Sequence, residues 1–213
     1  LVIANALADD IDQPDADKPA FTDEECVVIK DWVKDGGSLL LIADPGPFGK
    51  SVANLAKQFG VDMGTQTIED TANSAEQYRS SLIVYSHENH GLVDHPITAG
   101  RDSNEKIGRD VVFGGQSLNG PKESVYFLKL ADSARNLNHG SNGETPADSS
   151  RGVAQGLALK FGGGRVVVLA EADMLTALHG EPPEKEPIGM NYPGVDNKQL
   201  TLNIMHWLSG LLK

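Results

Sequence analysis

The stretch FTDEECVVIKDWVKDGGSLLLIAD, residues 21–44, decides the fold that this sequence predicts. Thr22 is followed three residues later by Glu25, the spacing of a capping box that satisfies two free amides at the start of a helix. A glycine pair then ends the helix. The next residues, SLLLIA, form a continuous apolar run of the kind found in strands buried on both faces of a parallel sheet. A helix followed at once by such a strand indicates an α/β domain.

The apolar residues of this helix fall on one face. Cys26, Ile29, Trp32 and Val33 recur at helical spacing, so we expect all four to face the core. Cys26 is the single cysteine of the chain. It is therefore predicted to be a packing residue, and the sequence can form neither an internal disulfide nor a cysteine-rich zinc site.

Similar units extend to both sides of this stretch. Residues 1–6 are predicted to be a buried strand, and because they stand at the very start we expect the sequence to begin inside a longer one. Residues 51–60 are predicted to be a helix that has Ser51 near its start and Gly60 as its stop signal. Shorter strands are expected at 81–85, 111–113 and 125–128.

The second half of the sequence predicts a hairpin and a final helix. GLALKF and RVVVLA flank three glycines at 162–164, which indicates an antiparallel pair joined by a tight turn. The polar stretch 132–152 is predicted to be a long loop, functional and mobile. Asp196 or Asn197 is expected to cap the last helix. Its predicted apolar stripe consists of Leu200, Ile204, Trp207, Leu208 and Leu211.

Length and charge narrow the classes of function. The chain has 213 residues, which suits one domain over 1–213, and we find no linker or repeat. The net charge of −12 would repel phosphate backbones, so nucleic acid is not an expected partner. No apolar run is long enough to predict a transmembrane segment. No cofactor motif is present, and nothing in the sequence specifies an oligomeric state.

The order of four segments resembles the class I glutamine amidotransferase-like superfamily. These segments are residues 21–44, HPITAGR at 95–101, GGGRVVVLAEADMLT at 162–176 and DNKQLTLNIMHWL at 196–208. They are similar to uncharacterised bacterial members related to gliding-motility transporter accessory and intraflagellar transport domains. The resemblance implies a flavodoxin-like three-layer sandwich with a mostly parallel sheet and a C-terminal antiparallel hairpin. It also implies an upstream β-α-β portion, and a location outside the cytoplasm.

The catalytic residues of that superfamily are not matched. Its nucleophilic cysteine occupies a tight turn between a strand and a helix, whereas Cys26 falls on a predicted buried helix face. Pro45 also stands where similar proteins have a histidine after the aspartate. We therefore do not expect glutamine hydrolysis by the usual route, and no catalytic residue is assigned.

Polar residues gather where the predicted parallel strands end. Open α/β sheets bind ligands at this edge, so we expect a polar cleft there. Three carboxylates that meet there would raise one another's pKa values or bind a cation, although solvated loop acids and helix caps are the simpler interpretation. The candidate ligand-binding residues are Asp44, Phe48, Lys50, Ser51, Glu171, Asp173, Asn191 and Asp196.

Other motifs are weaker. Gly46, Gly49 and Lys50 precede a helix as an anion cradle would, but glycine and proline here are expected to shape a turn. His87 and His90 could ligate a metal only from a helix, and we expect a surface loop, so no metal is assigned. His95 is expected to order the turn that contains it.

The sequence thus favours a non-catalytic or divergent amidotransferase-like domain that binds a small polar or carbohydrate-like ligand, or a protein partner, at the carboxyl edge of its sheet. One alternative is a hydrolase that uses Asp44, Glu171 or Asp173 as acid and base. The other is a structural scaffold domain. A shared dry pocket around the carboxyl groups would favour the enzyme, and an exposed apolar patch would favour the scaffold.

Overall fold

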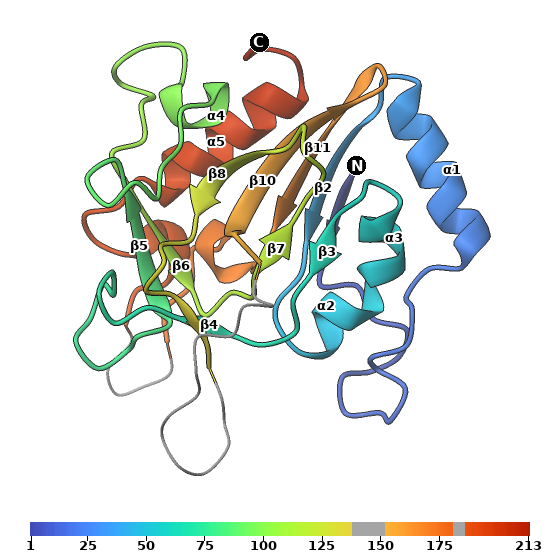
Figure 1. Ribbon diagram of the computed structural model, residues 1–213, viewed down its shortest axis with the longest axis horizontal. Coiled ribbons are helices and arrows are strands. Elements are labelled where there is room, and N and C mark those ends of the chain that lie inside the picture. Colours follow the sequence, from blue (N-terminus) through green and yellow to red (C-terminus); the bar gives the residue numbers. More distant parts are fainter. Residues whose placement is uncertain (138–151, 181–185) are drawn as a thin grey trace.

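The computed structural model describes residues 1–137, 152–180 and 186–213. Within these residues, seven strands form one mixed sheet, in which β8 pairs with β10 beside the main path β1-β2-β11-β10-β7-β3 (Figure 1). The strands are β1 (Val2–Ala4), β2 (Ser38–Ile42), β3 (Asp62–Met63), β7 (Leu118–Asn119), β8 (Val125–Lys129), β10 (Ala154–Phe161) and β11 (Gly164–Leu169). Two small antiparallel sheets pair β4 (Ile68–Glu69) with β9 (Arg135–Asn136) and β5 (Leu82–Ser86) with β6 (Arg109–Phe113).

The sheet is mixed, which corrects the expectation of a mostly parallel one. Only the pairings of β1 with β2 and of β2 with β11 are parallel in the described sheet. β10 runs antiparallel to β11, β7 and β8. The physical reason is the predicted hairpin, which is confirmed: the tight turn at Gly162, where φ is +59°, can join only antiparallel strands.

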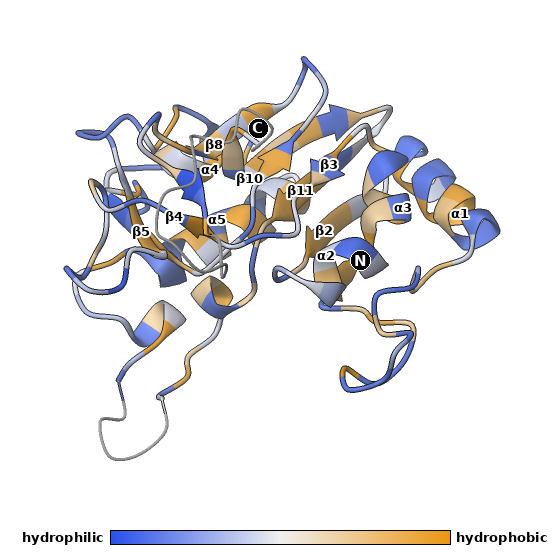
Figure 2. Cartoon of the chain, turned by 60° about the horizontal axis from the view of Figure 1, so that its bottom comes forward, coloured by the Kyte–Doolittle hydropathy of each residue, from blue (hydrophilic) through white to orange (hydrophobic). Residues whose placement is uncertain are grey.

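Helices cover both faces of the sheet. β2 alternates, so that Leu39 and Leu41 face one core and Leu40 and Ile42 face the other. The first core packs under α1 (Asp23–Lys34), α2 (Pro47–Ser51) and α3 (Ala53–Lys57). The second packs under α5 (Asn197–Leu208), which contacts α4 (Pro96–Ala99). Figure 2 shows hydrophobic residues gathered on the strands between these layers.

Helix α1 forms as its capping box predicts. The Thr22 hydroxyl accepts a hydrogen bond from the Glu25 amide at 3.2 Å, and the Glu25 carboxylate accepts one from the Thr22 amide at 2.8 Å. Cys26 and Val33 are fully buried, as expected. The placement of Trp32 in the core was wrong, because its side chain is 45% exposed. Its ring instead covers Gly37, where a Cβ would overlap it.

The helix expected at 51–60 begins earlier and is broken. α2 starts at Pro47, whose fixed φ suits a first helical turn, and Val52 separates it from α3. Ser51 therefore ends α2 and does not begin a helix. Gly60 follows α3 with a φ of +71°, in agreement with its predicted role as a stop signal.

The ends of the described chain also differ in part from expectation. β1 is a strand, but it lies at the sheet edge, so Leu1 and Val2 are more than half exposed. In α5, the predicted stripe is buried from Leu200 to Leu208, whereas Leu211 is exposed because the helix has already ended. Most of the predicted loop at 132–152 lies outside the described residues, and its described start contains β9.

Two further helical segments, η1 (Asp173–Leu175) and η2 (Gly189–Asn191), are single 3₁₀ turns that contact each other. Among the described residues, no helix has the length and apolar character that crossing a membrane requires.

We predict that Gly164→Ala destabilises the fold. Gly164 is buried at the start of β11, and a Cβ there would overlap the carbonyl oxygens of Val33 and Gly37. Overpacking of this kind costs about 1–3 kcal/mol of unfolding free energy, measurable by urea denaturation. Gly163→Ala is the matched control, since its Cβ would make ordinary contacts of 3.4 Å. Equal stability of the two variants would contradict the prediction.

Candidate functional site

Asp44 lies at the carboxyl edge, between the ends of β1 and β11. Its Oδ2 accepts a hydrogen bond from Asn5 Nδ2 at 2.6 Å, and its amide donates to Asn5 Oδ1 at 2.8 Å. Its Oδ1 accepts one from the Ala172 amide at 2.7 Å. Asn5 adopts a φ of +49°, a left-handed conformation that asparagine tolerates better than most residues. Asp44 thus ties three parallel strands together at one edge.

Glu171 lies beneath this edge, two residues after the end of β11. Its side chain is 1% exposed, and its carboxyl accepts hydrogen bonds from the amides of Phe113 at 3.2 Å and Met174 at 3.0 Å. Burial, the largest cause, and the charges of Asp173 and Asp44 raise the pKa of Glu171, the two amides lower it, and the net result is a pKa of about 8. At neutral pH the Glu171 carboxyl is therefore largely protonated.

Asp173 is the third carboxyl side chain at this edge. It opens η1 and is half-buried, and burial followed by the charge of Asp44 raises its pKa. Its carboxylate forms no hydrogen bond with the rest of the described chain, so it is available to a ligand. The structure thus brings together Asp44, Glu171 and Asp173, as expected from the parallel strands that precede them.

A fourth carboxyl, Asp110 on β6, was missed by sequence reasoning. It is fully buried, and neither of its oxygens has a hydrogen-bond partner. Burial raises its pKa well above the ordinary range, and the charges of Glu171 and Asp196 add to the effect. The only signal in the sequence is an acidic residue directly before the apolar run of a predicted strand. The position beside Glu171 comes from the pairing of β5 with β6 and the packing of α5.

A network of buried hydrogen bonds connects this edge to the β5-β6 sheet. Gln116 Nε2 donates to the Ala43 carbonyl at 2.9 Å, and Gln155 Nε2 donates to the Gln116 carbonyl at 3.1 Å. The Tyr85 hydroxyl donates to Gln155 Oε1 at 2.5 Å. Gln116 Oε1 is buried without a partner and lies against Gly49, where a Cβ would overlap it. This network positions the residue before Asp44 relative to the β5-β6 sheet.

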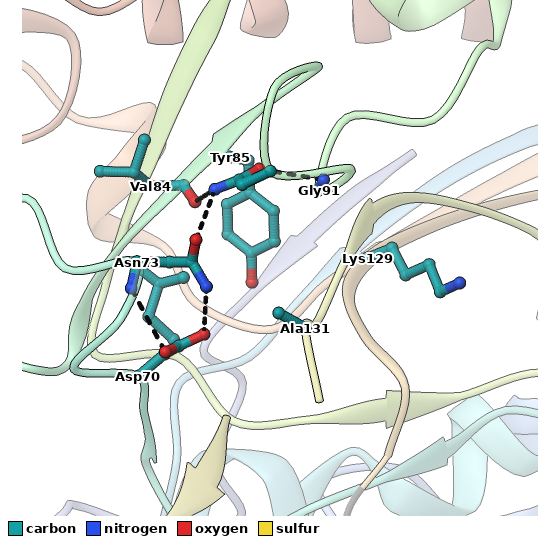
Figure 3. A pocket seen from close by; sticks show the side chains of 9 residues that line it. Asp70, Asn73, Val84, Tyr85, Gly91, Lys129 and Ala131 are labelled. Atoms are coloured by element: carbon teal, nitrogen blue, oxygen red, sulfur yellow. Dashed lines mark hydrogen bonds between the residues drawn. The ribbon is translucent and has the colours of Figure 1, made fainter. Parts of the chain in front are cut away.

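Beside Tyr85 lies a small polar pocket of about 10 Å³, shown in Figure 3. Asn73 Nδ2 donates to Asp70 Oδ2 at 2.7 Å, while Asn89 Nδ2 donates to Asn73 Oδ1 at 3.1 Å and to the Val84 carbonyl at 2.8 Å. A volume of this size holds about one water molecule. The network therefore orders the loops and leaves no room for a ligand.

Two of the predicted site residues bind elsewhere and do not join Asp44, Glu171 and Asp173. Lys50 pairs with Asp17 at 3.1 Å, and the buried Ser51 hydroxyl donates to the Lys18 carbonyl at 2.7 Å. Both side chains hold the loop that precedes α1. The Gly46 amide donates to the Thr65 carbonyl at 3.0 Å, which suits a turn better than an anion cradle.

The remaining three predicted residues also make local contacts. Phe48 packs partly buried against the core beneath α1 and α3. Asn191 donates weakly to the Leu178 carbonyl at 3.4 Å. Asp196 precedes α5, but its side chain does not cap the helix; it accepts from the amides of Gly108 at 2.7 Å and Arg109 at 3.0 Å. The eight candidates therefore do not form one cluster, although Asp196 contributes to the electrostatics of Asp110.

The histidines take the places expected for them. His87 and His90 lie in the turn after β5, and His95 orders the start of α4 by accepting a hydrogen bond from the Ile97 amide at 3.2 Å. Across the described ranges, no group of three or more histidine, cysteine, aspartate or glutamate side chains is arranged to hold a metal ion.

No protein-family model and no curated protein matches the sequence. Among solved structures, the mmIFT52 N-terminal domain is similar with 15% identity and a TM-score of 0.58, over 89% of this chain and 72% of that one. Cytoplasmic Protein STM3548 from Salmonella typhimurium gives 14% identity and a TM-score of 0.49, over 97% of this chain and 70% of that one. At 15% identity the likeness to the mmIFT52 N-terminal domain shows the fold alone, and it agrees with the part of the sequence resemblance that names intraflagellar transport domains.

Proposed function

We propose that this chain is a non-catalytic or divergent member of the amidotransferase-like, flavodoxin-like domains, and that it binds a small polar ligand at the carboxyl edge of β1, β2 and β11. The observation that carries this proposal is the combination of the half-buried Asp173 carboxylate, which no described residue binds, with Asp44 and the buried Glu171 beside it. Glu171 retains its proton at neutral pH because its pKa is about 8. Asp173 offers an acceptor that the described chain leaves unused.

This combination suits a carbohydrate-like ligand. Each hydroxyl group of a sugar both donates and accepts hydrogen bonds, so carboxylate oxygens at the edge match its donors. An anionic ligand would face the charges of Asp44 and Asp173, which already raise the pKa of Glu171. A neutral polyol avoids that repulsion. A positively charged sugar would be attracted by the negative charges of Asp44 and Asp173.

Two observations, the burial of Cys26 and the hydrogen bonds of Asp44, favour a binding function over a catalytic one. Cys26 is fully buried, and burial raises the pKa of its thiol, so a reactive thiolate does not form there. Both oxygens of Asp44 already accept hydrogen bonds from Asn5 and Ala172. A carboxylate held on both sides is positioned to support a site, and it is a poor nucleophile.

Glu171 also supports a second candidate function. Hydrolases that use two carboxyl groups need one with a raised pKa as the acid and another as the base, and Glu171 beside Asp173 has this character. On this reading, Glu171 is the acid and Asp173 the base. Release of product from a bound sugar substrate would separate this candidate from the binding domain.

A ligand screen tests the proposed function through thermal stability. We expect one or more neutral or amino sugars to raise the melting temperature, since a ligand at 100 times its Kd stabilises the folded state by about 2.7 kcal/mol. Asp173→Asn should abolish the shift without loss of fold contacts. Asp31→Asn, an exposed change on α1, is the control. Absence of a shift with every sugar, or a shift that survives in Asp173→Asn, would overturn the proposal.

The raised pKa of Glu171 predicts a dependence of stability on pH. The folded-state pKa of about 8 exceeds the ordinary 4.5, so the folded protein holds a proton that the unfolded chain releases. The contribution is complete below pH 4.5 and is lost as the pH rises to about 8. We expect Glu171→Gln to remove this loss, at up to ~1.4 kcal/mol per pH unit.

The measurement is the free energy of unfolding by urea at several pH values from 5 to 8. Glutamine keeps an oxygen that can accept from the amides of Phe113 and Met174, so the fold is retained. Glu88→Gln, in the exposed turn after β5, is the control and should follow the parent protein. Parallel profiles for the parent protein and Glu171→Gln would show that Glu171 ionises normally.

A further inference from the structure

A separate cavity lies at the other end of β10 and β11. Its volume is about 470 Å³, within the range of pockets that hold small molecules. Residues of α4, α5, β8 and β10 line it. In Figure 1, α4 lies beside α5 and β8 beside β10. Lys160 on β10 pairs with Arg165 near the start of β11, whereas Glu171 follows the end of that strand. The cavity is therefore distinct from the carboxylate edge.

The inner wall of the cavity is apolar and held in place. It includes Trp207, which is only 2% exposed, together with Val125, Ala158 and Pro96. The Trp207 ring meets the His95 ring edge to face at 5.1 Å between centroids. The Arg165 guanidinium also lies over the indole, at 5.2 Å from the ring centroid. The indole is thus almost fully covered and fixes the wall in place, while the partly exposed Val125 and Pro96 offer apolar contacts to a ligand.

His95 lines the cavity and carries a hydrogen-bond donor. Its Nδ1 accepts a hydrogen bond from the Ile97 amide at 3.2 Å, so the neutral ring carries its proton on Nε2. Burial, followed by the charges of Lys160 and Arg165, lowers the pKa of His95 to about 4, and the ring is neutral at pH 7. Nε2 has no hydrogen-bond partner in the described chain.

The charges around the cavity are mainly positive, in a chain with a net charge of −12. Lys160 and Lys213 line it, and neither forms an ion pair with a described residue. Arg165 lies close enough for its charge to act on His95. The acidic group of the lining is Glu123, which is exposed. The unpaired ammonium of Lys160 and the free Nε2–H of His95 both match an anionic oxygen.

We propose that this cavity binds an aromatic monocarboxylate, whose ring packs against the apolar wall beside Trp207 and whose carboxylate faces Lys160 and Nε2 of His95. The apolar wall accommodates the ring, and the two donors select the anion. This site is independent of the carbohydrate-like ligand proposed for the opposite edge, so either proposal can fail alone.

Phenylacetate is the probe, and Trp207 reports its binding. The chain has two tryptophans, and Trp32 is exposed on α1, so Trp32→Phe leaves Trp207 as the single indole. Titration of this variant with sodium phenylacetate should change the Trp207 emission in a saturable way. Phenylacetamide, which has the same shape without the charge, should bind about tenfold more weakly. No saturable change, or equal binding of the two probes, would overturn the proposal.

Substitutions at the rim test the role of charge on the same background. We expect Lys160→Met to weaken phenylacetate binding about tenfold and Glu123→Gln to strengthen it. Lys57→Met, an exposed change on α3, is the matched control and should leave the affinity unchanged. His95→Asn keeps an acceptor for the Ile97 amide but removes the Nε2 donor, and should also weaken binding. Unchanged affinity in Lys160→Met would show that the carboxylate is not held there.

Discussion

The parallel pairing of β2 with β11 is the contact on which the rest of the structure depends. Every side chain of β2 from Leu39 to Ile42 is buried, alternately against the two helical layers. Because the pairing is parallel and in register from Ser38 to Ile42, both strands end at the same edge. Asp44 and Glu171 each stand two residues beyond these ends. The register that fills both cores therefore also brings the carboxyl groups together.

That edge contains polar groups which the fold tolerates at a cost. A buried carboxyl without partners, such as Asp110, destabilises the folded state by an amount on the order of 1–3 kcal/mol, and protonation limits the penalty. Gln116 Oε1 is a second buried group without a partner, close to the same edge. Unfavourable groups of this kind concentrate where a protein binds or reacts. Asp110 lies on β6 close enough to Glu171 for their charges to interact, and Gln116 binds the carbonyl of Ala43 at the end of β2.

Local signals in the sequence predicted the elements that local physics controls. The capping box at Thr22 and the turn at Gly162 depend on neighbouring residues, and both formed as expected. The mixed sheet could not be predicted in the same way, since β10 meets β7 and β8 from distant parts of the chain. Trp32 had the right spacing for the core, but the neighbouring turn left its ring partly in solvent.

The candidate site was predictable to the same extent. Asp44, Glu171 and Asp173 were found because each follows a recognisable strand, and a parallel sheet places such ends side by side. Lys50 and Ser51 instead bind the loop before α1, because α2 already begins at Pro47. Asn5 is part of the site because it forms hydrogen bonds with Asp44. Asp110 is close to Glu171 because β6 is buried there by the tertiary fold. No spacing in the sequence specifies either.

The two ends of β11 carry opposite electrostatic character, and the pKa shifts show it. Burial raises the pKa of Glu171 beside other acids at one end, and lowers the pKa of His95 beside Lys160 and Arg165 at the other. In both places desolvation disfavours the charged form, and like charges add to it. Each end has therefore converted one titratable group into a neutral hydrogen-bonding group at pH 7. The charges around these two neutral groups are negative at one end and positive at the other, and the two proposals, a neutral polyol at one end and an anion at the other, follow from that difference.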